Sequence, residues 1–403
     1  MTQFNITLTE EHLHGLFVSN GRDEAFSKLL EEIFNQVLLK QSAEQIGAAP
    51  YERTDERLGY RNGFRERQMT TRVGTIHLRV PRHRNGKFST ELFERYQRSE
   101  QALVLAMMEM VVNGVSTRKV ESITEELCGK KFSKSTVSAL CKKLDPLVHT
   151  FRTRPLENQY PFLIVDALYL KVREDSRVQS RGLLIAIGVN KEGCREIIGF
   201  HVANTESESS WGELFGSLEE RGLKSVHLIT SDNHKGLVNA IQKHFQGATW
   251  QRCQTHFSRN MLDQTPKSHQ PEIKEDLRQL YEAVDIESAR DTRDKIINKY
   301  ESKAPKAVCL LDEAFDDITA VLILPLKYRK RLRTTNGVER LNQEIRRRER
   351  VIRIFPNEQS VIRLMGALLM EQDEKWQTGR KYFDMDLYYQ VLQKKASNNS
   401  AVA

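Results

Sequence analysis

Two aspartates stand where carboxylate chemistry would be possible, each beside a segment typical of a buried strand. Asp166 interrupts the run 161–172, which is otherwise almost entirely apolar and rich in strand-forming residues. Asp232 directly follows a second such run, residues 226–231. A carboxylate in a buried strand is costly unless it is ion-paired or binds a cation. Asp166 is therefore expected to be either a paired structural acid or a metal ligand.

A third candidate group lies on a charged segment near the C-terminus. Residues 333–350 are expected to form a helix that begins near Asn336 and carries Glu339 within about its first turn. Asn342 and Arg346 follow on neighbouring turns, and Arg350 could also approach the Glu339 side. Either these polar groups meet at a site, or the helix is simply amphipathic with a solvated face.

Cys253 and His256 have a spacing that also occurs in zinc sites. A structural zinc ion needs four ligands, and no partner pair stands nearby in the sequence. The five cysteines contain no C-x-x-C pair, so neither a zinc ribbon nor a disulfide framework is expected.

The elements that would position the two aspartates follow one another in a recognisable order. Three successive strands, a helix, a strand, a helix and a short strand are expected over residues 161–172, 181–189, 195–202, 209–218, 226–231, 233–245 and 248–253. This order matches a ribonuclease-H-like core, in which the first and fourth strands are neighbours. Asp166 and Asp232 are then able to converge.

Basic residues gather in two segments of the chain. The chain as a whole carries a net charge of +8, and residues 51–99 contain 12 Lys or Arg against 6 Asp or Glu, while residues 327–353 contain 11 against 3. Two concentrated basic regions suggest contact with a polyanion, above all nucleic acid, although each alone could be a solvated face.

The first basic segment and the one after it predict a DNA-binding region. Alternation around residues 73–80 indicates a half-buried hairpin strand, and Arg82 and Arg84 extend its basic face. Residues 111–147 have a helix-turn-helix pattern, with Val120, Ile123 and Leu127 on the inner face of the first helix. Ser133 can cap the second helix, whose outward residues would meet base edges: Lys134, Ser135 and Thr136.

The predicted fold is α/β, with a ribonuclease-H-like catalytic core that contains a helical insertion. A mostly helical N-terminal DNA-binding region with a helix-turn-helix precedes the core. The boundaries are expected at residues 1–50 for an N-terminal helical segment, 51–150 for the DNA-binding region, 158–256 and 328–380 for the two parts of the core, 257–327 for the insertion and 381–403 for a polar tail.

The composition is that of a protein of the cytoplasm. It is 39% hydrophobic and 29% charged, no run of about 18 apolar residues occurs, and the N-terminus lacks a basic, apolar signal. No membrane partner is expected.

Taken together, these motifs make the chain similar to the mutator-type transposases of bacterial insertion sequences, which are related to plant Mutator elements. The resemblance covers roughly residues 50–376. It rests on residues 114–120, Asp166 with 167–173, Asp232 with 235–237, residues 251–260 around Cys253 and His256, and residues 334–342 around Glu339. Asn233 departs from the pattern, since relatives usually have a smaller residue there.

The resemblance implies an Asp-Asp-Glu catalytic triad, Asp166, Asp232 and Glu339, which binds Mg²⁺, with Mn²⁺ as a possible substitute. It implies cleavage at the inverted-repeat ends and transfer to target DNA by a homodimer or a larger assembly. Cys253, His256, Asn336 and Asn342 would flank the site. The alternatives are a DNA-binding repressor on an inactive scaffold and a free-standing ribonuclease H or Holliday-type nuclease.

Overall fold

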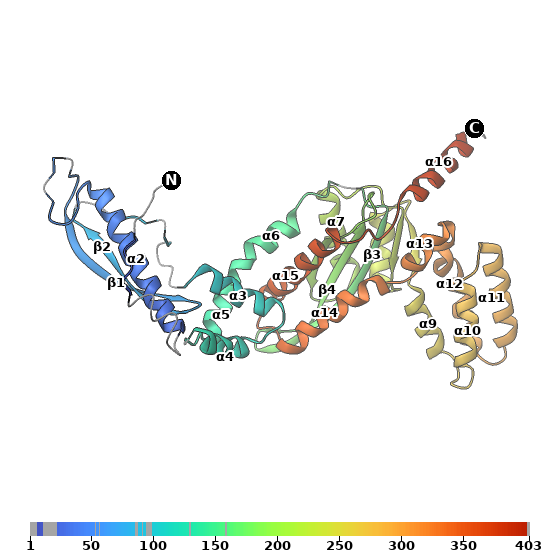
Figure 1. Ribbon diagram of the computed structural model, residues 1–403. Helices are drawn as coiled ribbons and strands as arrows, with labels where there is room; N and C mark the ends of the chain where they lie inside the picture. Colours follow the sequence, from blue (N-terminus) through green and yellow to red (C-terminus); the bar gives the residue numbers. More distant parts are fainter. Residues whose placement is uncertain are drawn as a thin grey trace. The chain divides into compact units, whose positions relative to one another are not determined.

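The computed structural model describes residues 6–10, 22–52, 54–55, 57–84, 88–90, 92–93, 99–128, 130–157 and 159–400. Within these ranges the side chains of residues 22, 23, 336, 339 and 394–400 are not described. The chain forms two compact units, Met1–Lys143 and Leu144–Ala403. Figure 1 shows the helices and strands of both units, coloured along the sequence.

The first unit begins with a helix that covers a two-stranded sheet. Helix α2 (Arg22–Ile46) packs on strands β1 (Arg61–Thr71) and β2 (Gly74–His83), which pair antiparallel. The small core contains five buried side chains: Leu38, Met69, Ile76, Leu78 and Val80. Glu31 and Asn35 of α2 accept hydrogen bonds from the backbone N–H groups of His77 and Arg79, at 2.8 and 2.7 Å. The helix thereby satisfies backbone groups of β2 that face away from β1.

Three short helices complete the first unit: α3 (Gln101–Val112), α4 (Thr117–Cys128) and α5 (Lys134–Cys141). Ser133 caps α5, since its side chain accepts a hydrogen bond from the Thr136 N–H at 3.2 Å. The predicted inner face of α4 is partly wrong. Val120 is buried with Thr124 and Cys128, whereas Leu127 is 58% exposed. The neighbouring helices α3 and α5 cover the face of α4 that contains Val120, Thr124 and Cys128, and Leu127 lies outside that face.

The second unit is built on a mixed five-stranded sheet with the order β5-β4-β3-β6-β7. The strands are β3 (Phe162–Glu174), β4 (Arg177–Val189), β5 (Arg195–Ala203), β6 (Leu228–Ser231) and β7 (Thr249–Arg252). Short turns join β3, β4 and β5, which are antiparallel, while β6 and β7 run parallel to β3. Parallel pairing needs long crossovers, and α7 (Glu208–Glu220) and α8 (Lys235–His244) supply them. The α/β class predicted from the sequence is confirmed.

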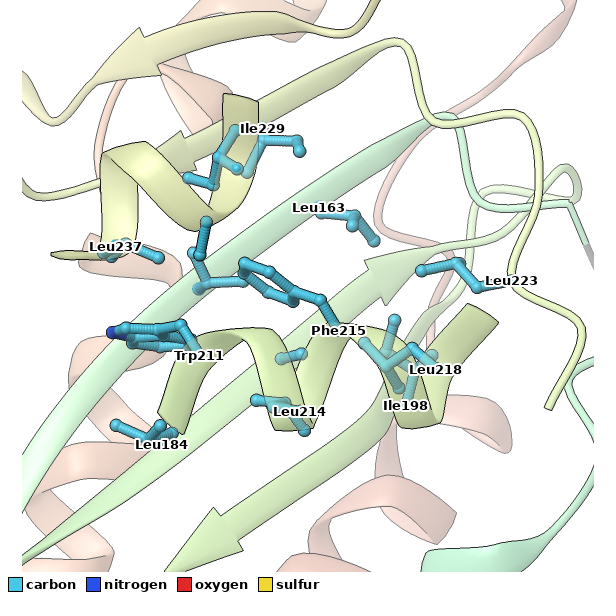
Figure 2. Packing of buried hydrophobic residues seen from close by; sticks show 14 of the residues in the cluster. Leu163, Leu184, Ile198, Trp211, Leu214, Phe215, Leu218, Leu223, Ile229 and Leu237 are labelled. Carbon is cyan, nitrogen blue, oxygen red and sulfur yellow. The ribbon is translucent and has the colours of Figure 1, made fainter. Parts of the chain in front are cut away.

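Helices cover both faces of this sheet. On one face α7 and α8 bury Trp211, Leu214 and Phe215 against strand residues such as Leu163 and Leu184, as Figure 2 shows. On the other face lie α14 (Asn336–Ile352) and α15 (Glu358–Gln377), together with α6 (Asp145–Thr153), which packs on α15 (Figure 1). Asp166 lies on β3 toward the α14 side.

A group of helices stands between β7 and α14. It comprises α9 (Gln254–Asp263), α10 (Gln270–Tyr281), α11 (Ile286–Tyr300), α12 (Pro305–Thr319), the 3₁₀ turn η2 (Ala320–Ile323) and α13 (Leu326–Leu332). This group has its own apolar core, which includes Phe257, Leu277 and Phe315.

The C-terminal segment, expected as a polar tail, packs on the sheet through part of its length. Phe383, Met385 and Tyr388 are buried, and the Tyr388 ring lies 4.8 Å from that of Phe162, centroid to centroid. Helix α16 (Asp386–Ser400) follows. No helix among the described residues is both long and apolar enough to cross a bilayer.

Candidate active site

The pairing of β3 with β6 sets the two aspartates beside each other. Phe162 pairs with Leu228 and Ile164 with Thr230, in parallel register. Asp166 and Asp232 each stand two residues beyond the last of these pairs. Asp166 is within β3 on the face of Ile164, since side chains alternate along a strand, and Asp232 directly follows the last residue of β6. The two carboxylates are close enough that the negative charge of Asp232 acts to raise the pKa of Asp166.

Asp166 is mostly buried, and its environment makes the carboxyl group a weaker acid than usual. Burial, together with the negative charge of Asp232, raises the pKa of Asp166 to about 6. A hydrogen bond from Asn342 and the proximity of His256 oppose this rise. Two carboxylates placed side by side in a partly buried site repel each other unless a proton or a cation neutralises them.

Helix α14 supplies the next polar group. Asn342 Nδ2 donates to Asp166 Oδ2 at 2.7 Å, although the two residues are 176 positions apart in the sequence. This hydrogen bond orients both side chains. Glu339 lies one turn before Asn342 on the same helix. The side chains of Glu339 and Asn336 lie outside the described residues. The predicted contact of Glu339 with the two aspartates therefore stays a prediction.

Cys253 and His256 stand at the start of α9, next to the aspartates. The Thr335 N–H donates to Cys253 Sγ at 3.3 Å, and the His256 side chain lies close enough to the same sulfur to affect its pKa. Burial acts to raise the pKa of the Cys253 thiol, but the interactions with His256 and Thr335 outweigh it, so the pKa lies below its ordinary value. The interaction with Cys253, and then the charges of Asp166 and Asp232, raise the pKa of His256.

A further carboxylate near Asp232 was not predicted from the sequence. Glu206, between β5 and α7, has a side chain only 7% exposed. It accepts hydrogen bonds from Trp211 Nε1 at 3.1 Å and from the Tyr169 hydroxyl at 3.2 Å. Burial and then the charge of Asp232 raise the pKa of Glu206. Glu206 stands three residues after the end of β5 among polar residues, so the sequence pattern does not single it out.

The two arginines expected near Glu339 differ in their surroundings. Arg346 Nη1 donates to the Tyr169 carbonyl oxygen at 2.8 Å and pairs with Glu349 at 2.6 Å, so it braces α14 against β3. Arg350 is exposed. The remaining residues expected to bind DNA belong to the first compact unit and are exposed there: Arg82, Arg84, Lys134, Ser135 and Thr136.

The donor set around Asp166 suits a hard divalent cation better than zinc. Its atoms are carboxylate and amide oxygens, the ligands that Mg²⁺ prefers. The Asn342 Oδ1 atom is buried and has no hydrogen-bond partner among the described residues. Across the described side chains, no three of His, Cys, Asp or Glu group closely enough to hold a metal ion, and Glu339 falls outside that set. Zinc would need further ligands beside Cys253 and His256, and the described side chains supply no such group.

Comparison with known proteins decides the family. A family model described as "Transposase, Mutator family" matches residues 1–379. The chain belongs to this family. It is 47% identical over 390 residues to the transposase for insertion sequence element IS256 in transposon Tn4001 of Staphylococcus aureus, which covers 96% of this chain and all of that one. It is 45% identical to the transposase for ISRM5 of Rhizobium meliloti, over 90% and 91% of the two chains. With the transposase for IS1081 of Mycobacterium tuberculosis the identity is 42%, over 88% and 86%. The resemblance inferred from the motifs is confirmed, and the chain is a transposase.

Proposed function

We propose that this transposase binds the inverted-repeat ends of its insertion sequence and catalyses metal-dependent DNA cleavage and strand transfer with Asp166, Asp232 and Glu339. The observation that carries the proposal is the placement of Asp166 beside Asp232, with Asn342 of α14 bonded to Asp166. The order of strands and crossovers supports a ribonuclease-H-like core.

The protein's own residues hold this site in shape. Asn342 orients the Asp166 carboxylate, and the hydrogen bond from the Thr335 N–H to Cys253 Sγ ties the start of α9 to the residue just before α14. Asp166, Asp232 and Glu339 would hold Mg²⁺, or Mn²⁺ in its place. When bound, the cations supply positive charge at the phosphate under attack.

Two displacements at phosphorus account for transposition. In the first, a water oxygen attacks the phosphodiester at the element end, and the 3′-oxygen leaves and takes up a proton. In the second, that 3′-hydroxyl attacks a phosphodiester of the target and loses its proton, while the target's own 3′-oxygen leaves. Each step exchanges one phosphorus–oxygen bond for another, and no covalent protein–DNA bond is needed.

The first unit would recognise the element ends. Lys134, Ser135 and Thr136 are exposed in the first turn of α5, which begins at a capped N-terminus, as a recognition helix does when it meets base edges. Arg82 and Arg84 would contact phosphates. Pairing of two element ends calls for a homodimer or a larger assembly on DNA.

Incubation of the full chain with Mg²⁺, duplex DNA bearing an element end and a target plasmid tests the proposal. We expect strand cleavage at the end and joining to the target, both abolished by chelation of the metal and by Asp232→Asn. Specific binding of the end without any cleavage in Mg²⁺ or Mn²⁺ would instead favour a DNA-binding repressor.

A further inference from the structure

The first turn of α14 carries Glu339, the third acid of the proposed catalytic set, at its end. Among the described residues, the Thr335 side chain makes no capping hydrogen bond to this turn, and its hydroxyl lies 3.5 Å from Cys253 Sγ instead. The first turn of a helix opens readily without a cap, because its leading N–H groups have no partners within the helix. Contacts from other elements are therefore needed to hold the backbone that carries Glu339.

Arg195, the first residue of β5, supplies such a contact. Its Nη1 donates to the Gly337 carbonyl oxygen in the first turn of α14, at 3.1 Å. Its guanidinium carbon lies 4.2 Å from the centre of the Trp376 ring and 4.3 Å from the centre of the Tyr382 ring. Each aromatic face attracts the cation and restricts its movement. Arg195 thus links β5, α15 and the segment that follows α15 to the start of α14.

Tyr382 is itself tied to the turn before β5 and to α13. The N–H groups of Tyr382 and Phe383 both donate to the Gly193 carbonyl oxygen, at 2.8 and 3.0 Å. Gly193 has a φ of +86°, and a Cβ atom there would collide with the Phe383 carbonyl oxygen, so the two segments are in close contact. Arg331 of α13 lies over the Tyr382 ring, 4.9 Å from its centre, and donates to the Tyr382 carbonyl oxygen. The ring is therefore a fixed support for Arg195.

The start of α14 fits closely between Tyr382 and the strand that carries Asp166. A Cβ atom at Gly337 would lie 2.9 Å from the Tyr382 hydroxyl oxygen and 3.9 Å from Ile164 Cδ1. Ile164 is two residues before Asp166 on β3 and lies on the same face of the sheet. A shift of the first turn of α14 would therefore change the position of Glu339 relative to Asp166.

We infer that Arg195, placed over its two aromatic rings, is a positioning residue for Glu339. Asn342 fixes α14 at one point, through its hydrogen bond to Asp166, and Arg195 fixes the helix at a second point one turn earlier. A displacement of a reacting group by about 1 Å can lower the rate about 100-fold, so the second contact matters for catalysis. The inference rests on the proposed function, since it takes Glu339 as the third acid.

Hydrogen exchange of the full chain in EDTA, followed by mass spectrometry, tests whether Arg195 holds the first turn. Arg195→Met removes the charge and the donor and keeps an unbranched side chain. We expect peptides that cover residues 336–345 to exchange about tenfold faster in this variant, because their amides bond to carbonyl groups of the first turns. Arg152→Met is the matched control, since Arg152 lies over the Phe200 ring at 5.1 Å and its helix, α6, packs on α15 and β5. Exchange at residues 336–345 should stay unchanged in this control.

Cleavage of end DNA by the same variants tests the link to Glu339. Arg195→Met should raise the Mg²⁺ concentration needed for half-maximal cleavage by about 10- to 100-fold, as loss of other groups that orient a metal ligand does. Binding of end DNA in EDTA, and its dependence on salt, should stay as in the wild type, because Arg195 would contact no phosphate. Arg152→Met should have the wild-type Mg²⁺ dependence.

Three outcomes would overturn the inference. Unchanged exchange at residues 336–345 in Arg195→Met would show that Arg195 does not hold this turn. Faster exchange with an unchanged Mg²⁺ dependence would show that the turn does not position a metal ligand. A weaker salt dependence of end binding would make Arg195 a phosphate contact instead.

Two further points keep the test decisive. If Arg195→Met fails to fold, Trp376→Leu replaces it with the same expected results, since it removes one of the two rings that support Arg195. If the wild type does not cleave end DNA with Mg²⁺ or Mn²⁺, the proposed function fails. The exchange measurement, made in EDTA, then decides by itself whether Arg195 holds the start of α14.

Discussion

At the scale of single residues, the site is organised by bonds between groups far apart in the sequence. Asn342 holds Asp166, and Trp211 and Tyr169 hold Glu206 near Asp232. The sequence identified Asp166 and Asp232 because each breaks or ends an apolar run. It missed Glu206 because an acid among other polar residues gives no such contrast, and only the fold shows that this one is buried.

The raised pKa of Asp166 predicts how metal binding depends on pH. With a pKa of about 6 in the free protein, Asp166 is ionised above about pH 7 and takes up a proton as the pH falls through about 6. A cation has to displace that proton, so the affinity for Mg²⁺ should be constant above about pH 7 and fall by up to about tenfold per pH unit below 6. Calorimetric titration with Mg²⁺ at several pH values measures this.

Asn342→Leu provides the matched variant for that experiment. The Asn342 hydrogen bond lowers the pKa of Asp166, so its removal should raise that pKa further and move the loss of Mg²⁺ affinity to higher pH. At neutral pH the affinity should fall by about 10- to 100-fold, as for other residues that orient a metal ligand. A pH profile identical to that of the wild type would show that Asn342 does not act on Asp166.

Arg346 and Arg350 are expected to behave differently although both lie on α14. Arg346→Glu would break its bond to the Tyr169 carbonyl oxygen and place a second acid beside Glu349, which should weaken the packing of α14 on β3. Arg350 is exposed, so Arg350→Glu should leave the fold intact and reduce strand transfer through weaker DNA binding. Strand transfer assays at two salt concentrations, with thermal unfolding as the control, separate the two effects.

At the scale of elements, the order of strands and helices was predictable and their packing was not. The runs 161–172, 181–189 and 195–202 correspond to β3, β4 and β5, because β-branched residues and turn signals mark strands locally. Which face of α4 is buried depends on neighbouring helices, so Leu127 was misassigned. The burial of Phe383 and Tyr388 was likewise not predicted, because the segment that contains them is mostly polar.

Asp373 of α15 joins three elements of the second unit. It is 4% exposed, accepts a hydrogen bond from the Ile197 N–H at 2.6 Å and pairs with Arg154 at 3.0 Å. Asp373→Ala leaves both donors without their acceptor, and we expect a loss of about 3 kcal/mol in the free energy of unfolding. Glu371→Ala, which removes a more exposed pair with Lys375 on the same helix, should cost less than about 0.5 kcal/mol. Tryptophan fluorescence during urea denaturation follows the second unit alone, since all three tryptophans lie there.

At the scale of the whole molecule, the division between the two units falls at Lys143 and Leu144. Helix α6, just beyond this boundary, packs on α15. Arg363 of α15 donates two hydrogen bonds to the Asp145 carboxylate, at 2.6 and 2.7 Å. A fragment that ends at residue 150 would therefore retain part of α6 without its partner helix. Residues 1–143 are the better choice for separate study.

The fragment 1–143 should bind element-end DNA by itself. We expect its affinity for end DNA to exceed that for unrelated DNA and to fall steeply with rising salt, because basic side chains contact phosphates. Thr136→Ala on the exposed side of α5 should reduce the preference for the end more than it reduces binding to unrelated DNA. Gel-shift titrations at several salt concentrations measure both, and equal affinity for the two DNAs would contradict sequence recognition by this unit.

The central claim is that Asp166, Asp232 and Glu339 meet at one metal site, and Fe²⁺-directed cleavage of the polypeptide tests it most directly. Fe²⁺ takes the place of Mg²⁺, and with peroxide and ascorbate it generates radicals that cut the backbone only near the bound ion. The predicted result is cleavage close to residues 166, 232 and 339 together, suppressed by excess Mg²⁺. Cuts near residues 166 and 232 without any near residue 339, or cuts that Mg²⁺ does not suppress, would contradict the account.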